Sequence, residues 1–370
     1  MSIDDLLGPG IMVLTGSDGV GKTTISAALA ARAAMKQDLR VAVLTIDPAR
    51  RLANAMGLAK LGNRLRVVDL SRGGAKPKGT LYAGMLETKS AWDELIRKQA
   101  TDRAAADRII QNPFYQEISG AFVGSHEYIA MERLYDLWQS EKYDLIVLDT
   151  PPSRNALDFL EAPNRMAELV SGGLLGLLAR PGMAAGKVGF RMFSVATKPV
   201  MWIADRMLGG STLSELSEFL LSIEGLYEGF KQRAEGVYRL LEDSSTSFVV
   251  VTTLEDVPFD EARFFVEKLG EAGMHLAGAV VNKRLPSWLL DAPAAHLAGE
   301  LAKGGDPAEA ALGANYLAYR TLAERDQDLM ARVDELGVPL LGSVPRMPEP
   351  VHDLKGLLEV GETLAASADS

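Results

Sequence analysis

The sequence contains no cysteine, which excludes disulfide bonds and every zinc, thiolate or redox site built from cysteine. Histidine is also rare, and the four that occur are scattered without the spacing of a metal-ligand set. They are His126, His275, His296 and His352. We therefore expect no zinc site.

Long apolar runs and basic clusters are missing as well. The longest apolar stretch, near residues 172–179, is far shorter than a membrane span and ends at Arg180-Pro181. Residues 1–5 are acidic and lack the basic start of a signal peptide. The net charge is −10 and no stretch concentrates lysine and arginine, so nucleic-acid binding is not expected. With 370 residues, 47% of them hydrophobic, the chain is predicted to be a soluble cytoplasmic protein of two or three domains.

A complete phosphate-binding loop, G-x-x-x-x-G-K-T, occupies residues 16–23. Lys22 supplies charge for the β- and γ-phosphates, the Thr23 hydroxyl is placed to bind Mg²⁺, and Thr24 is expected to hold phosphate. An apolar run precedes the loop and an Ala-rich segment follows it, which aims a helix N-terminus at the anion. The alternative is a glycine-rich turn that binds nothing. The predicted nucleotide-binding residues here are Gly16, Ser17, Asp18, Gly19, Val20, Gly21, Lys22, Thr23 and Thr24.

Short runs rich in valine, isoleucine and leucine predict buried parallel strands. They lie at residues 11–15, 40–46, 65–70, 143–148, 248–252, 277–281 and 338–344. Helical segments separate most of these runs, so we predict an α/β fold with a doubly wound, mainly parallel sheet and ligand at the carboxyl ends of its strands. Residues 90–141 read as helical throughout. The predicted domains are a nucleotide-binding core, residues 1–155 and 244–370, and a helical insertion, residues 156–243.

Two of the predicted strands end in acids at the edge where phosphate would lie. Asp149 suits a role in holding Mg²⁺, usually through water, and Asp47 suits the orientation or deprotonation of an attacking water. The alternative is that both acids only cap strand-to-loop turns. Because both acids follow a phosphate loop in the chain, we interpret Asp149 as a metal-binding residue. Asp47 and Lys22 are interpreted as catalytic.

The ends of two further strands suit recognition of the base. Asn282 can donate to a purine edge and accept from it together, although a strand-end asparagine can also simply form a turn. The segment after the last strand, with Pro345 and Arg346, could wrap the base.

At these residues the chain resembles the ATPase family of arsenite pumps and tail-anchored-protein targeting, which belongs to the deviant phosphate-loop class. The resemblance covers nearly the whole length and rests on residues 16–24, Asp47-Pro48-Ala49, Asp149-Thr150-Pro151 and Asn282. Residues 46–53 and 149–154 resemble a bacterial, actinobacterial-type branch more specifically. The resemblance implies that Asp47 positions the attacking water and Asn282 contacts adenine. It also implies two subunits that close over ATP and an inserted helical subdomain with an apolar client groove.

The chain departs from this family inside the loop, where the family reads G-K-G-G-x-G-K-T. The family's first lysine reaches the partner subunit's phosphates, but Ser17 stands there, and Asp18 replaces a glycine. A hydroxyl cannot replace a cation that stabilises charge in phosphoryl transfer. Three explanations are open: an arginine such as Arg50, Arg51 or Arg154 substitutes, a paralogous partner donates its lysine, or turnover is slow. Ser17 could also be a tolerated variation. The family's cysteine-bound zinc and thiolate sensing of arsenite are excluded because cysteine is absent.

The predicted insertion is rich in methionine, whose flexible side chains suit varied apolar partners. Five of the fourteen methionines lie between residues 160 and 210, namely Met166, Met183, Met192, Met201 and Met207. Three interpretations are open: an ordinary subdomain core or dimer face, a groove for a hydrophobic helix, and a transient membrane-surface contact.

Taken together, these features predict a Mg²⁺-dependent dimeric ATPase that binds ATP or ADP and couples the nucleotide state to the helical insertion. The alternative is a weakly hydrolysing regulatory or scaffold subunit that forms a heterodimer with a lysine-bearing paralogue. A chromosome- or septum-positioning ATPase is disfavoured by the missing lysine and the acidic balance.

Overall fold

The structure is a computed structural model that describes residues 3–46, 53, 55–56, 62–74, 76–118, 125–150 and 226–367. Its described residues form two compact units. The first contains the described residues up to Met85 together with residues 137–150 and 242–367, and the second contains those of 86–136 and 226–241. The predicted insertion lies largely outside the described residues, so its boundaries stay a prediction.

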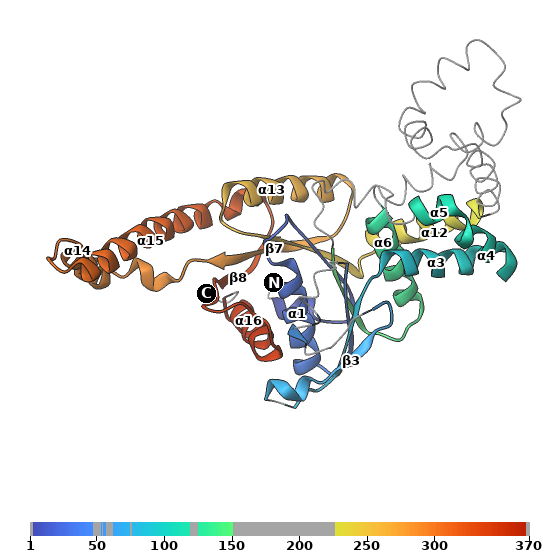
Figure 1. The fold of residues 1–370 in the computed structure, drawn as a ribbon, viewed down its shortest axis with the longest axis horizontal. Helices are drawn as coiled ribbons and strands as arrows, with labels where there is room; N and C mark the ends of the chain where they lie inside the picture. The colour runs from blue at the N-terminus through green and yellow to red at the C-terminus, as the bar shows by residue number, and fades with distance from the viewer. Residues whose placement is uncertain are drawn as a thin grey trace, which may run out of the picture. The chain divides into compact units, whose positions relative to one another are not determined.

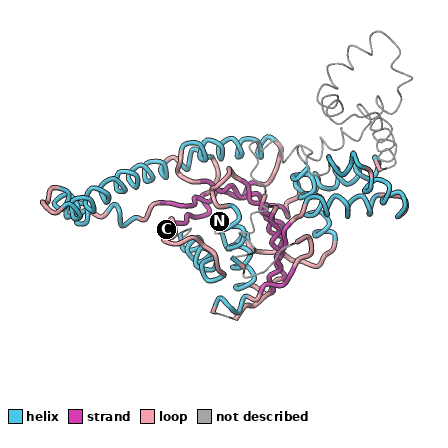
Figure 2. The backbone as a smooth tube through the Cα atoms, viewed as in Figure 1, coloured by secondary structure: helices cyan, strands magenta, loops and turns pink. Residues whose placement is uncertain are grey.

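The first unit is built on one sheet with the strand order β3-β4-β2-β5-β1-β6-β7-β8 (Figures 1 and 2). All neighbouring strands run parallel except β3 and β4. The predicted α/β fold with a doubly wound, mainly parallel sheet is therefore confirmed. The strands are β1 (Gly10–Thr15), β2 (Arg40–Thr45), β3 (Arg66–Val68), β4 (Thr80–Met85), β5 (Leu145–Asp149), β6 (Thr246–Thr252), β7 (Leu276–Arg284) and β8 (Leu340–Pro345).

Two helices cover one face of this sheet, α1 (Lys22–Lys36) and α16 (Leu354–Ser367) (Figure 1). They pack on alternate side chains of the strands, such as Val43 and Val147, which a parallel sheet covered on both faces buries completely. A Cβ at Gly361 of α16 would lie 3.1 Å from the carbonyl oxygen of Ala28, so the alanines of α1 and this glycine allow the two helices to approach closely.

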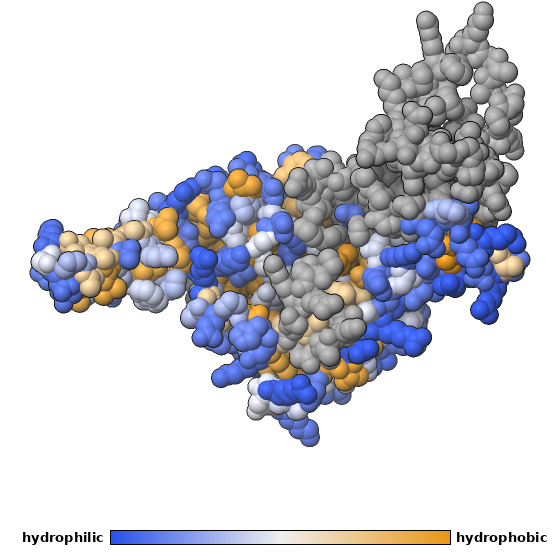
Figure 3. All heavy atoms as spheres, in the orientation of Figure 1, coloured by the Kyte–Doolittle hydropathy of each residue, from blue (hydrophilic) through white to orange (hydrophobic). Residues whose placement is uncertain are grey.

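The opposite face carries α13 (Asp256–Glu271), the end of α15 (Pro307–Ala331) and the short helix η5 (Val333–Leu336). Phe259 and Leu336 pack there against Ala279 and Val281, which point to the other side of β7 from Val280. Between β7 and β8 the chain also forms η4 (Ser287–Leu290) and α14 (Ala292–Ala302), and α14 pairs with α15. Apolar residues are visible along α14 and α15 in Figure 3.

Both described ends of the chain are attached to α1 through Arg32, whose side chain is only 8% exposed. Its guanidinium donates two hydrogen bonds, of 2.6 and 2.7 Å, to the carboxylate of Asp4 in η1 (Ile3–Leu6). It also lies 2.7 Å from Glu362 of α16. The hydrogen bond from Arg32 holds the pKa of Asp4 below its ordinary value.

Two features at the edge of the sheet differ from the sequence prediction. The segment predicted as a parallel strand at residues 65–70 contributes β3, which is antiparallel and leaves Arg66 and Val67 exposed, followed by η2 (Leu70–Gly73). Strand β4 was not predicted, because its sequence, TLYAGM, contains alanine and glycine in place of β-branched residues. Gly84 belongs there because a Cβ would lie 2.6 Å from the side chain of Leu65.

The second unit is helical, as predicted for the described part of residues 90–141. Its helices are α3 (Thr88–Gln99), α4 (Arg103–Gln111), α5 (Pro113–Ile118), α6 (Ser125–Gln139) and α12 (Tyr227–Glu242). Within the described ranges, no helix combines the length and the apolar character needed to cross a bilayer.

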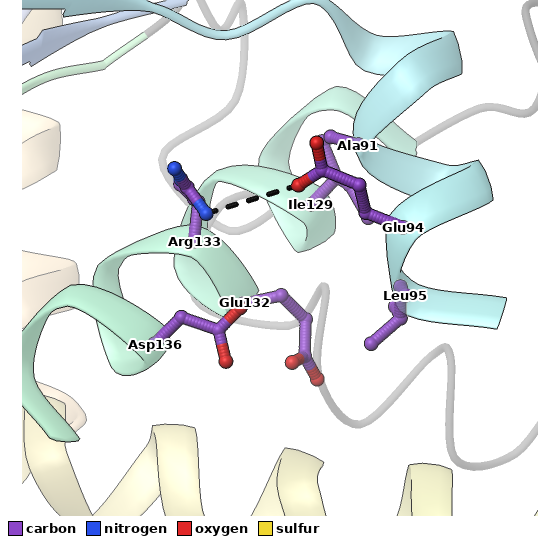
Figure 4. Close-up of a pocket in the computed structure, with 7 residues that line it drawn as sticks. All are labelled: Ala91, Glu94, Leu95, Ile129, Glu132, Arg133 and Asp136. Atoms are coloured by element: carbon purple, nitrogen blue, oxygen red, sulfur yellow. Dashed lines mark ion pairs between the residues drawn. The ribbon is translucent and has the colours of Figure 1, made fainter. Parts of the chain in front are cut away.

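A charge network centred on the buried Glu132 holds α6 to α12 and α3. Glu132 of α6 accepts hydrogen bonds from the Tyr128 hydroxyl and the Arg233 guanidinium, each at 2.5 Å. Arg233 also donates to Asp136, which pairs with Lys98 of α3. Burial raises the pKa of Glu132 and outweighs the opposing effect of Arg233. Glu132 and Asp136 line a small pocket, together with Glu94 and Arg133, which form an ion pair there (Figure 4).

Candidate functional site

The loop between β1 and α1 has the backbone shape that its glycines permit. Gly16 and Gly21 have φ values of +147° and +97°, which side chains with a Cβ rarely adopt. A Cβ at Gly16 would lie 2.1 Å from the carbonyl oxygen of Val251 in β6, and one at Gly21 would lie 2.3 Å from Asn282 Nδ2. The loop is therefore fitted tightly between the ends of β6 and β7.

Helix α1 begins directly at this loop. Gly21 occupies its N-cap position, and no side chain caps the first turn. The first N–H groups of a helix have no partner within it and carry the positive end of the helix dipole. This geometry presents a set of backbone donors to an anion.

Lys22, the first residue of α1, curls back over the loop. Its ammonium donates to the carbonyl oxygens of Gly16 and Ser17, each at 2.8 Å, and the residue is only 7% exposed. The positive charge is thus held at the mouth of the loop. Thr24 lies half-buried in the same helical turn.

Two hydroxyls meet one carboxylate beside the loop. Thr23 Oγ1 and Thr45 Oγ1 each donate to Asp149 Oδ2 at 2.6 Å. These residues come from the start of α1 and the ends of β2 and β5, and Asp149 is buried. Hydroxyl and carboxylate oxygens are the hard donors that Mg²⁺ prefers, so the residues present fit this ion. Thr45 was not predicted, because a threonine at the end of a strand is ordinary there.

The end of β7 contacts the other side of the loop through two consecutive residues. Asn282 Nδ2 donates to the carbonyl oxygen of Val20 at 2.8 Å, and Lys283 Nζ donates to that of Gly19 at 2.6 Å. Asn282 is buried, whereas Lys283 is exposed. The sequence predicts that Asn282 contacts the base, but no role for Lys283 is predicted from it.

A pocket of about 440 Å³ lies beyond this strand end. It is mostly apolar, with Arg346 among its polar lining residues, and its aromatic wall comes from η4 and α15. The Arg346 backbone N–H donates to the Arg284 carbonyl oxygen at 2.7 Å, which joins the ends of β7 and β8, and Pro345 is half-buried beside it. Lining residues include Leu285, Trp288, Tyr316, Tyr319, Arg346 and Met347.

The two unusual residues of the loop differ in exposure. Ser17 is only 5% exposed, and its Oγ has no hydrogen-bond partner in the described part of the chain. Asp18 is exposed at the tip of the loop. Asp47 and the three arginines considered as substitutes for the family lysine lie outside the described residues. These arginines are Arg50, Arg51 and Arg154.

Comparison with known proteins gives a consistent family assignment. The profile of a family described as anion-transporting ATPase matches residues 10–290. An ATPase GET3 of Malassezia globosa is 26% identical over 271 residues, which cover 73% of this chain and 71% of that protein. A putative arsenical pump-driving ATPase 2 of Aquifex aeolicus is 26% identical over 278 residues, covering 73% of this chain and 79% of that protein.

These matches confirm the resemblance drawn from the sequence, while the actinobacterial-type branch stays a prediction. The matched residues 10–290 include β1, the loop, the end of β5 with Asp149 and the end of β7 with Asn282. Since the profile covers well over half of its length, the chain belongs to the anion-transporting ATPase family.

Proposed function

We propose that this protein binds ATP with Mg²⁺ at the β1–α1 loop and hydrolyses it as a dimer. One observation carries the proposal: the hydroxyls of Thr23 and Thr45 both donate to one carboxylate oxygen of Asp149. This group lies next to Lys22 and the N-terminus of α1, which no side chain caps. The groups that would bind phosphate and Mg²⁺ thus come from the loop, the start of α1 and the ends of β2 and β5.

The phosphates would bind to the N–H groups at the start of α1. Lys22 would exchange the carbonyl oxygens of Gly16 and Ser17 for phosphate oxygens, since an ammonium bonds either. Thr24 would add a hydroxyl from the same turn.

Mg²⁺ would be held by Thr23 and Asp149, with Thr45 orienting the carboxylate. The ion, when bound, neutralises charge on the β- and γ-phosphates. Asp149 is buried between two hydroxyl donors, so its orientation is fixed before any ligand arrives. Asp47 is proposed to position the attacking water.

The adenosine end would extend from Asn282 toward the pocket beside Arg346. That pocket is of a size usual for small-molecule sites, and it is apolar with few polar groups. Pro345 and Arg346 are joined to the end of β7 by a backbone hydrogen bond, which keeps both strand ends together at one edge. Because of this arrangement, we assign base recognition to these residues.

A second function is supported by a specific observation at Ser17. Where the family carries a lysine, this chain has a buried neutral side chain without a hydrogen-bond partner among the described residues. A subunit of this kind would bind nucleotide but turn it over slowly by itself, and a paralogue would supply the cation in a heterodimer. In either case, opening and closing of the dimer would be coupled to residues 156–243, where a hydrophobic helix is the proposed client.

Nucleotide binding and turnover by the purified chain test these proposals. We expect ATP to bind in the presence of Mg²⁺, and Lys22→Ala to weaken binding at least tenfold. Lys36→Ala, a change at the exposed end of the same helix, is the matched control. Fast turnover that Lys22→Ala abolishes supports the ATPase, whereas tight binding with slow turnover, restored by a lysine-bearing paralogue, supports the second function. Absence of ATP binding overturns both.

A further inference from the structure

We propose that Lys283 is a positioning residue of the phosphate loop, which it clamps together with Asn282. The inference rests on the proposed nucleotide site and deepens it. No feature of the loop sequence points to Lys283. The inference assigns this residue a definite role in nucleotide affinity.

The clamp consists of two hydrogen bonds to neighbouring carbonyl groups. Asn282 Nδ2 donates to Val20 and Lys283 Nζ donates to Gly19, at 2.8 and 2.6 Å. Both bonds connect residues more than 260 positions apart in the sequence, and they tie the loop to the end of β7, which is separated from β1 by β6. With both carbonyl oxygens engaged from outside, the peptide groups between Gly19 and Gly21 are fixed in one orientation.

The backbone at the end of β7 is built to make this contact. In a regular strand, consecutive side chains point to opposite faces of the sheet. Asn282 and Lys283 nevertheless reach the same loop, because the pairing of β7 with β8 shifts register between Val281 and Arg284. A bulge of this kind re-aims side chains and is frequent beside functional sites.

Lys283 also has a left-handed conformation, with φ at +61°, which is uncommon for a residue with a Cβ. Glycine or asparagine would occupy this position with less strain. A glycine at this position would form the same turn but would lack the side chain that lysine provides. The hydrogen bond to Gly19 is the contact that uses it.

The geometry favours positioning over direct charge stabilisation in phosphoryl transfer. The ammonium of Lys283 binds a carbonyl oxygen of the loop, on the β7 side, whereas Lys22 occupies the mouth of the loop. Loss of the clamp should therefore weaken ATP and ADP equally, since both nucleotides use the same N–H groups. A residue that acted on the γ-phosphate would change ATP binding or turnover selectively.

The test compares four variants of the full chain. Lys283→Met keeps the stem and removes the donor, Lys283→Gly keeps the backbone conformation, and Lys283→Arg keeps a charged donor. Lys303→Met, at an exposed lysine after α14, is the matched control. Hydrogen exchange of residues 16–24 is measured without nucleotide, and dissociation constants are measured for ATP and ADP.

We expect Lys283→Met and Lys283→Gly to speed exchange in the loop and to weaken ATP and ADP alike by about tenfold, the effect of one hydrogen bond from a charged donor. Lys283→Arg should retain most of the affinity, and Lys303→Met should behave as wild type. Unchanged loop exchange in Lys283→Met overturns the inference, as does a loss confined to turnover. If wild type binds neither nucleotide, the proposed function fails, and loop exchange in the nucleotide-free chain still decides whether the clamp exists.

Discussion

Thr23 Oγ1 lies 2.6 Å from Asp149 Oδ2, which joins the first turn of α1 to the end of β5 across 126 positions of sequence. The contact exists because β1 and β5 are parallel neighbours in the sheet, with Leu14 opposite Asp149. Strand β2 adds Thr45 from the other side of β5. The proposed metal site is therefore a property of strand order as much as of the loop motif.

Asp149→Asn should lower Mg²⁺-dependent ATP turnover at least a hundredfold, because an amide is a much weaker ligand for a hard cation than a carboxylate. Binding of ATP without Mg²⁺ should change little. Steady-state turnover and nucleotide titrations, each with and without Mg²⁺, measure the two effects. Asp38→Asn, at an exposed acid before β2, is the control and should match wild type. Equal turnover in Asp149→Asn and wild type would contradict the proposed metal role.

Ser17→Ala separates a structural role of the hydroxyl from a role in binding. Because the buried Oγ has no partner within the described residues, its removal should leave stability unchanged or raise it by up to about 1 kcal/mol. Urea unfolding measures this change. If Ser17→Ala also binds ATP as wild type does, the hydroxyl takes no part in the site. A loss of affinity above about tenfold would instead make it a phosphate ligand.

Arg32→Met should destabilise the first unit, since it removes the hydrogen bonds to Asp4 and the ion pair with Glu362. Because both acids are about half exposed to water, we expect a loss of only about 1–2 kcal/mol in the free energy of unfolding. The effect should depend on pH. The pKa of Asp4 is lowered in the folded state, so its contribution is present above its unfolded pKa and is lost as the pH falls through the folded value. Asp4→Asn should therefore differ from wild type in urea unfolding at pH 7, and the difference should shrink as the pH falls below 3.8, the ordinary pKa of the aspartate side chain. A difference that stays constant with pH would refute the assignment.

Arg233→Met should cost the helical unit about 3–5 kcal/mol at pH 7, because it leaves Glu132 buried without its cation. Burial already raises the pKa of Glu132, and loss of Arg233 raises it further. A group whose folded pKa is raised binds its proton more readily when folded, so the deficit should shrink as the pH falls from 7 to 5. The double variant Glu132→Gln/Arg233→Met should recover part of the loss at pH 7. Denaturant unfolding at both pH values provides the measurement, and a deficit that grows on acidification would contradict this account.

The sequence predicted the centre of the sheet better than its edge. Central strands such as β1 and β5 are continuous apolar runs, because both of their faces are buried. Strand β4 lacks that signature, and the antiparallel direction of β3 depends on its neighbour, which no local pattern records. The helical hairpin of α14 and α15 was likewise not predicted.

At the candidate site, the loop was recognised from its motif, and the pairing of Thr23 with Asp149 followed from the topology. Lys283 could not be found in this way, because its role depends on a shift in strand register and a positive φ that the sequence does not indicate. An Asn-Lys pair that ends a predicted strand in a phosphate-loop protein is the one signal that could have directed attention to it.

The position of β1 in the sheet also sets the order in which this protein can assemble. Met12 pairs with Val147 of β5 on one side and with Ser247 of β6 on the other. Strands β5 and β6 are synthesised long after β1. The strand that leads into the phosphate loop therefore remains unpaired during much of synthesis. An apolar segment exposed for that time is prone to misassociation. Until residue 247 has emerged, β1 therefore lacks one of its two neighbouring strands.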